Sequence, residues 1–303
     1  GYVEKEYFLS GNANVYDLKG GKLATKSNAD YVNRVIVFQP ENPEDFNGAV
    51  YVDILNASSW VDVPDMWRRS YDFFMEHGYI YVGITSKDVN VKSLKRFDPD
   101  RYRILNWKDK GNYENGLFLD MLGQRGTLIK EDESPILYGA NYDGDVHSYL
   151  IGQSQSGFYL NTFSNNFGPS NYILENPDEI EDGAELSGHP HIFDGFLNMV
   201  GGMTNASIAT KQTDPVISFK PVKKTEVPFI LMVGENDYNP GPVREDADEE
   251  DNKYRHYVVA GASHSEKVFL PDPLDEIQLK AGRAASDYPS FKTDGNDKPH
   301  TAS

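Results

Sequence analysis

The sequence of 303 residues contains no cysteine. Disulfide bridges, thiolate nucleophiles, cysteine-ligated zinc and iron–sulfur clusters are therefore excluded, and covalent chemistry would have to use Ser, Thr, Asp, Glu or Lys. No apolar run approaches the roughly 18 residues of a membrane-spanning helix, and the first ten residues lack the basic segment and apolar core of a signal peptide. We expect a soluble protein. Because the chain begins with Gly1, cytoplasmic and secreted locations both stay open.

Positive charge is also scarce. The 29 Lys and Arg residues face 47 Asp and Glu residues, which gives a formal net charge of −18. Such a chain repels nucleic-acid phosphates and anionic lipid headgroups over a long range. We therefore expect a small-molecule partner, and neither nucleic acid nor a membrane surface. The length is enough for one large α/β domain over residues 1–303, which would bury about 75% of its unfolded surface.

Short runs rich in β-branched and aromatic residues alternate with segments of helical spacing. Such alternation predicts an α/β fold with a mostly parallel sheet covered by helices on both faces. Strands are predicted at residues 34–40, 48–56, 79–86, 148–152, 227–234 and 254–261, and helices at residues 62–78, 115–130, 156–167 and 273–285.

The two ends of the chain and one charged block differ from this alternation. In about the first 30 residues, residue types alternate in the manner of an exposed antiparallel hairpin at the edge of the sheet. Residues 244–251, REDADEED, are predicted to form a solvated loop. Residues from about 287 to 303 are predicted to be a polar tail.

The segment GQSQSG at residues 152–157 joins a predicted strand to a predicted helix. A serine at the tip of such a turn needs small residues two positions before and after it, because these pack against each other. Gly152 and Ser156 bracket Ser154 in this way, whereas Phe158 would be the corresponding neighbour of Ser156 and is too bulky. We predict that Ser154 is a nucleophile and that the N–H of Gln155, at the helix start, is an oxyanion donor.

A serine hydroxyl needs a base, and the base needs an acid that fixes its tautomer. An acidic loop and a histidine follow the last two predicted strands, where open α/β sheets place their sites. Taken singly, Asp237 could be a turn residue and His264 a helix cap. Together with Ser154 they have the chain order nucleophile, acid, histidine, and we predict a triad. Asp237 is preferred to Glu235 because two more residues let the loop turn towards His264.

With these residues in place, the chain resembles the α/β-hydrolase superfamily, and more narrowly a bacterial group described as "alpha/beta hydrolase domain" proteins with a G-x-S-Q-S-G nucleophile elbow. Ser156 stands where the superfamily usually has glycine, which fits the narrower group. The resemblance implies an α/β-hydrolase fold and esterase-like acyl chemistry without a cofactor. It spans roughly residues 30 to 270 and rests on residues 98–105, 119–130, 151–157, 193–197, 227–239 and 254–264.

The second oxyanion donor is expected in the loop after strand 48–56, from the backbone around Asn56, Ala57 and Ser58. Three tryptophans could pack in the core or line a substrate cleft; they are Trp60, Trp67 and Trp107.

Two further groups of polar residues suggest metal sites only weakly. His189 and His191 lie near Asp194, but hydrogen-bonded loop histidines explain them more simply than a metal does. Asp143 and Asp145 lack the full pattern of a calcium loop, so we interpret them as turn residues. We expect no metal and no cofactor.

The sequence thus predicts a serine hydrolase that cleaves a carboxylic ester through an acyl-enzyme. Two alternatives stay open. An acyltransferase would use the same residues with an alcohol or amine as acceptor, and a binding protein would keep the fold and use the pocket as a receptor. The sequence specifies neither the acyl nor the alcohol group.

Overall fold

The structure is a computed structural model that describes residues 1–20, 22–131, 133–142, 144–168, 191–211, 219–238 and 244–265. In these ranges the elements, with 3-10 helices labelled η, are β1 (Tyr2–Lys19), β2 (Lys22–Pro40), η1 (Pro43–Asp45), β3 (Ala49–Ile54), α1 (Asp65–His77), β4 (Ile80–Ile84), α2 (Asp88–Phe97), α3 (Pro99–Tyr102), β5 (Lys108–Asp109), β6 (Asn112–Tyr113), α4 (Leu117–Lys130), η2 (Gly139–Asn141), β7 (His147–Gln153), α5 (Gln155–Asn166), β8 (Gly195–Met199), β9 (Phe229–Gly234), η3 (Glu235–Asp237), β10 (Ala247–Glu249) and β11 (Asn252–Val259).

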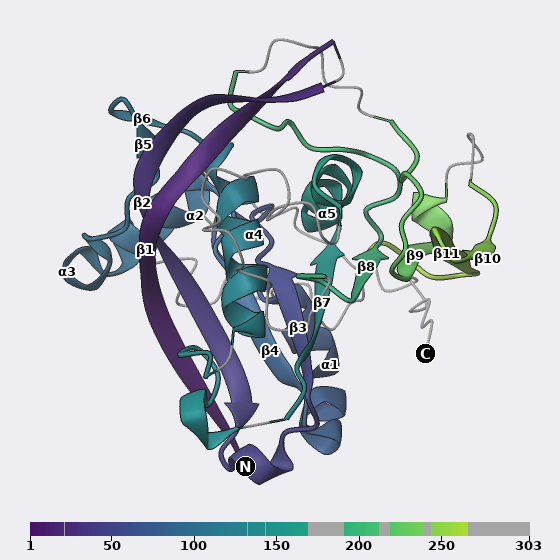
Figure 1. Cartoon of the computed structure of the whole chain (residues 1–303), viewed down its shortest axis with the longest axis horizontal. Coiled ribbons are helices and arrows are strands. Elements are labelled where there is room, and N and C mark those ends of the chain that lie inside the picture. The colour runs from purple at the N-terminus through teal and green to yellow at the C-terminus, as the bar shows by residue number, and fades with distance from the viewer. Residues whose placement is uncertain are drawn as a thin grey trace, which may run out of the picture.

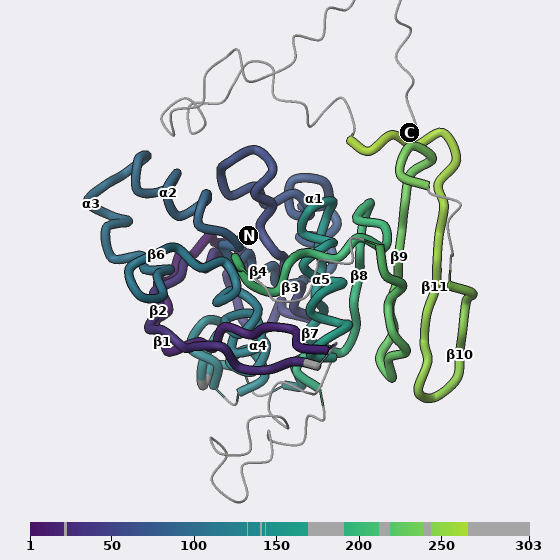
Figure 2. The backbone as a smooth tube through the Cα atoms, turned by 90° about the horizontal axis from the view of Figure 1, so that it is seen from above, coloured from purple at the N-terminus to yellow at the C-terminus, as the bar shows by residue number. Residues whose placement is uncertain are grey.

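Within the described residues, nine strands form one sheet in the order β1-β2-β4-β3-β7-β8-β9-β11-β10. The six strands from β4 to β11 pair in parallel, while β2 and β10 pair antiparallel to their neighbours. Figure 2 shows β9, β11 and β10 at one end of the molecule, far from the hairpin of β1 and β2. This confirms the predicted fold class of a mostly parallel sheet with an antiparallel N-terminal edge.

Helices cover both faces of the sheet, with α4 and α5 on one side and α1 on the other (Figure 1). Alternate strand residues supply the two apolar layers, because successive side chains point to opposite faces. On β4, Val82 belongs to the large cluster under α4 and α5, whereas Tyr81 belongs to the smaller cluster with Met66 and Phe74 of α1. None of the helices in the described ranges has the length and apolar character that a bilayer crossing requires.

The N-terminal hairpin is longer than predicted. β1 and β2 pair from Tyr2 with Pro40 to Lys19 with Lys22, so residues 34–40 are the end of the second arm and not a separate strand. The hairpin thus continues past residue 30, as far as Pro40. The hairpin is held onto α4 by Asp120, which accepts hydrogen bonds from the Tyr16 hydroxyl at 2.6 Å and the Asn14 N–H at 2.8 Å.

Two further differences concern short strands. The acidic block is not all loop, because Ala247–Glu249 forms the edge strand β10 against β11. Charged side chains are common on edge strands, where they discourage pairing with another chain. The strand β8 was not predicted, since Gly195 and Asn198 are residues that strands disfavour. The predicted helix at 273–285 and the polar tail lie outside the described residues.

Candidate active site

Ser154 lies between the end of β7 and the start of α5 and has φ of 54° and ψ of −119°. A non-glycine residue rarely adopts a positive φ, so the turn stores backbone strain that the surrounding structure must hold. The Ser154 N–H donates to the carbonyl of Met199, at the end of β8, at 2.8 Å. The serine is therefore fixed at the carboxyl end of the parallel strands.

The neighbours of Ser154 are small because backbone segments approach each other closely there. A Cβ atom added to Gly152 would lie 2.8 Å from the carbonyl carbon and oxygen of Ser156. One added to Gly157 would lie 2.4 Å from Oδ1 of Asn198. The contact between positions two before and two after Ser154 is the one that the sequence pattern indicated.

The structure brings the three predicted triad residues together. Nε2 of His264 lies 2.8 Å from Oγ of Ser154, and Nδ1 of His264 lies 2.6 Å from Oδ1 of Asp237. Asp237 ends η3 directly after β9, and His264 follows β11, so both loops leave the same edge of the sheet as the serine turn. In this arrangement the Nδ1–H donates to the carboxylate and Nε2 is left to accept from the serine hydroxyl.

Glu235 has a different contact. Its Oε2 accepts a hydrogen bond from the N–H of Gly261 at 2.7 Å. Gly261 precedes His264 by three residues, so Glu235 ties the histidine loop to the end of β9 and does not contact the imidazole.

The backbone N–H groups that were expected as oxyanion donors in the loop after β3 differ in whether they already have a hydrogen-bond acceptor. The Asn56 N–H donates to the carbonyl of Val63 at 3.0 Å, and the Asn56 side chain holds the carbonyl of Gln153 at 2.9 Å. The Ser58 N–H is also used, since it donates to Oδ1 of Asn56 at 2.8 Å. Within the described ranges, the Ala57 N–H has no such acceptor. The geometry thus argues against Asn56 as an oxyanion donor.

Gln155 begins α5 directly after Ser154. The first N–H groups of a helix have no intrahelical acceptor, and the helix dipole makes this end partly positive. The Gln155 N–H thus belongs to the partly positive end of α5, directly after the serine.

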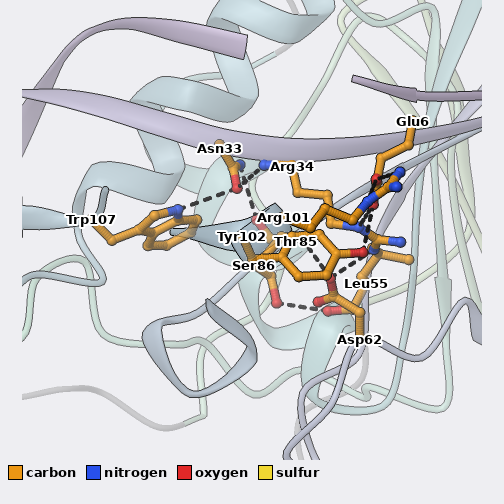
Figure 3. A network of polar contacts seen from close by, with 10 residues as sticks. All are labelled: Glu6, Asn33, Arg34, Leu55, Asp62, Thr85, Ser86, Arg101, Tyr102 and Trp107. Atoms are coloured by element: carbon orange, nitrogen blue, oxygen red, sulfur yellow. Dashed lines mark hydrogen bonds and ion pairs between the residues drawn. The ribbon is translucent and has the colours of Figure 1, made fainter. Parts of the chain in front are cut away.

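A network of charged side chains, largely buried except for Arg101, contacts the loop after β3 (Figure 3). Oδ2 of Asp62 accepts hydrogen bonds from Nη1 of Arg34 at 3.0 Å and from Oγ1 of Thr85 at 2.5 Å. Arg34 also contacts Glu6, which Arg101 binds in turn. Burial raises the pKa of the Asp62 carboxyl, and the Arg34 charge opposes that shift. The hairpin and the loop after β3 are thereby joined.

Two cavities flank the start of α5 and share Phe158 in their walls. One, of about 260 Å³, is lined by His264 and Asp237 together with His256 and the turn after β8. The other, of about 400 Å³, is lined by Lys87 and Gln155 among others. Sequence reasoning missed Lys87 and the Asp62 network, because no local pattern marks residues that meet only across the sheet.

The tryptophans do not line either cavity. Trp107 is fully buried and donates from Nε1 to Oδ1 of Asn33 at 3.2 Å. Trp67 stacks on Phe38 with ring centroids 4.3 Å apart. Trp60 is 58% exposed. Trp107 and Trp67 therefore pack against other side chains, as in the packing alternative.

Two of the residues considered as metal ligands, His191 and Asp194, have other partners in the structure. Nδ1 of His191 lies 3.6 Å from the Glu226 carboxylate, and Asp194 pairs with Lys130. His189 and Asp143 lie outside the described residues. No group of three or more His, Asp or Glu side chains that could hold a metal ion occurs in the part of the chain that the structure describes.

A serine at a strained strand-to-helix turn, in contact with a histidine and an aspartate above a mostly parallel sheet, defines the α/β-hydrolase class. The chain belongs to the family described as "Alpha/beta hydrolase domain", whose model matches residues 1–301. No curated protein sequence matches it.

Several solved structures are similar in fold at low sequence identity. Esterase Est22 is 9% identical with a TM-score of 0.40, and the match covers 78% of this chain and 63% of Est22. This chain thus spans less than two thirds of the length of Est22. Esterase B from Lactobacillus rhamnosis is 12% identical with a TM-score of 0.39, covering 83% and 76%. An alpha-beta serine hydrolase homologue from Coxiella burnetii is 11% identical with a TM-score of 0.36, covering 77% and 84%.

Proposed function

We propose that this member of the hydrolase family cleaves carboxylic esters through an acyl-enzyme on Ser154. The observation that carries the proposal is the hydrogen-bonded chain from Ser154 Oγ through the His264 imidazole to the Asp237 carboxylate, at 2.8 and 2.6 Å. These are the contacts that a serine nucleophile, its general base and the orienting acid need.

In the proposed reaction, Ser154 Oγ attacks the acyl carbon while His264 Nε2 takes the hydroxyl proton. Asp237 accepts the Nδ1–H, keeps the imidazole in the productive tautomer and stabilises the imidazolium. The bond from the acyl carbon to the ester oxygen then breaks, and His264 returns the proton to the leaving alcohol. Water then attacks the acyl-enzyme. His264 takes a proton from the water, and the water oxygen bonds to the acyl carbon. The bond from the acyl carbon to Ser154 Oγ then breaks as His264 returns the proton to Oγ.

The negative charge that develops on the carbonyl oxygen needs preorganised donors. We assign this role to the N–H groups of Gln155 and Ala57. Gln155 adds the positive end of the α5 dipole, and Ala57 lies on the loop that Asn56 and Asp62 hold in place. Loss of one such donor typically lowers kcat by about 10² to 10³.

The test is active-site labelling combined with ester turnover. The wild-type chain and the Ser156→Ala variant should react rapidly with a fluorophosphonate, and peptide mass mapping should find the adduct on Ser154. The Ser154→Ala variant should not react and should not hydrolyse a panel of esters. A label on Ser156, or equal turnover by the Ser154→Ala variant, would refute the proposal. Products formed with an added acceptor alcohol distinguish hydrolysis from acyl transfer.

A further inference from the structure

Lys87 is a cation at the wall of the larger cavity, in the connection between β4 and α2. Its Nζ lies 4.9 Å from the centre of the Tyr159 ring, so the ammonium rests on a side chain of α5, the helix that starts after Ser154. A cation over an aromatic face is attracted by the ring but keeps its full charge. The ammonium is therefore held beside the helix that directly follows the proposed nucleophile.

Among the described residues no carboxylate pairs directly with this ammonium, although the adjacent Asp88 charge acts on it. Asp88, the nearest acid in sequence, pairs instead with Lys92, and its Oδ1 accepts a hydrogen bond from Nδ2 of Asn115 at 3.0 Å. In the described part of the chain, no acid lies within ion-pair distance of Lys87 Nζ. Burial raises the pKa of the Tyr159 hydroxyl, so Tyr159 is neutral and does not supply a negative charge to Lys87.

The cavity is otherwise uncharged. Lys87 is the one charged residue among those that line it in the described ranges. Gln155 and Ser207 also line it, and among the described residues neither side chain has a hydrogen bond to protein. A partly buried cation costs free energy unless an anion accompanies it, and in the described ranges no protein carboxylate forms an ion pair with Lys87.

The geometry points to Lys87 as the binding group for a carboxylate on the substrate, so that the enzyme acts on carboxylic esters that carry a second carboxylate. The inference rests on the proposed function for the identity of the reacting bond. Gln155 and Ser207 supply neutral donors for the carboxylate oxygens. Gln155, which directly follows Ser154, lines the same cavity as Lys87, so an ester held at the Gln155 N–H would extend its second carboxylate into this cavity.

Matched ester pairs test the charge directly. The first pair is phenyl hydrogen adipate and phenyl hexanoate, with the carboxylate in the acyl portion. The second is the acetate ester of 6-hydroxyhexanoate and hexyl acetate, with the carboxylate in the alcohol portion. The wild-type chain should have a higher kcat/KM for the anionic member of one pair. Lys87→Met should reduce that preference by about 10- to 100-fold.

The matched control is Lys92→Met, which removes the cation five residues away that pairs with Asp88 outside the cavity. This variant should keep the wild-type preference. Equal kcat/KM for both members of both pairs, or an unchanged preference in Lys87→Met, would overturn the inference.

A binding measurement separates this inference from the proposed function. Phenyl hydrogen adipate should bind the Ser154→Ala variant in calorimetry, and adding Lys87→Met should weaken binding by about 10- to 100-fold. If no ester is turned over but this difference is found, the proposed function fails and the anion site stands. If esters are turned over but phenyl hydrogen adipate binds the Ser154→Ala variant equally well with and without Lys87→Met, the inference about Lys87 is refuted and the proposed function stands. Circular dichroism checks that each variant is folded.

Discussion

Nδ1 of His264 lies 2.6 Å from Oδ1 of Asp237, although 27 residues separate the two in the chain. Glu235, two residues before Asp237, instead accepts the N–H of Gly261. One acidic loop therefore supplies both a partner for the imidazole and an anchor for the loop that carries it. The two carboxylates have separable contacts, and substitution can tell them apart.

Replacing Asp237 by Asn is expected to lower kcat by on the order of 10³ to 10⁴ with little change in KM, because an amide can hold the imidazole in the wrong tautomer. Glu235→Gln should cost far less, since an amide oxygen can still accept the Gly261 N–H. Steady-state ester hydrolysis measures both. The opposite ranking, with both variants folded by circular dichroism, would assign the acid to Glu235.

The strained backbone at Ser154 predicts a stability difference between two inactive variants. Ser154→Gly should have a free energy of unfolding about 1 kcal/mol higher than Ser154→Ala, because glycine adopts a φ of 54° without steric cost. Both lack the hydroxyl, so loss of the hydrogen bond to His264 cancels in the comparison. Urea denaturation gives the difference, and an alanine variant of equal or greater stability would show that the turn is not strained.

Asp62→Asn is expected to lower the free energy of unfolding by about 2 kcal/mol, because it removes the charge that Arg34 and Thr85 bind in a nearly buried site. Ester hydrolysis should also slow, since Asp62 holds the loop of Ala57. The control is Asp100→Asn at an exposed position, where a change within about 0.5 kcal/mol is expected. Equal stability of the two variants in urea would show that the network does not anchor the loop.

The charge of Lys87 predicts how substrate preference depends on pH. Burial lowers the pKa of Lys87 to about 8, and the neighbouring Asp88 charge opposes that shift. A group with a lowered pKa loses its proton as the pH rises, so the ammonium is present below about pH 8 and lost above it. The kcat/KM ratio of an anionic ester to its neutral partner should fall through this range.

Taking a ratio removes the pH dependence of the catalytic groups, which act on both esters. In the Lys87→Met variant the ratio should be flat with pH. A wild-type ratio that does not change between pH 6 and about pH 10 would contradict a role for the Lys87 charge.

Much of the fold and the serine turn could be predicted because their causes are local. Side-chain alternation and helical spacing marked most of the central strands and helices within short windows. The choice of Ser154 over Ser156 followed from the size of residues two positions away, and the close contact of Gly152 with Ser156 is of that kind. The order of serine, acid and histidine after successive strands indicated which side chains would share one edge of the sheet.

Only the tertiary structure decided the features that depend on strand order and register. Lys87 follows β4 and Tyr159 lies on α5, and they meet because β4, β3 and β7 are neighbours in the sheet. The chain from Glu6 through Arg34 to Asp62 likewise joins β1, β2 and the loop after β3. The use of the Asn56 N–H by Val63 depends on the path of one loop. A sequence pattern reports the neighbours of a residue along the chain, whereas charge pairing and free donors depend on its neighbours in space.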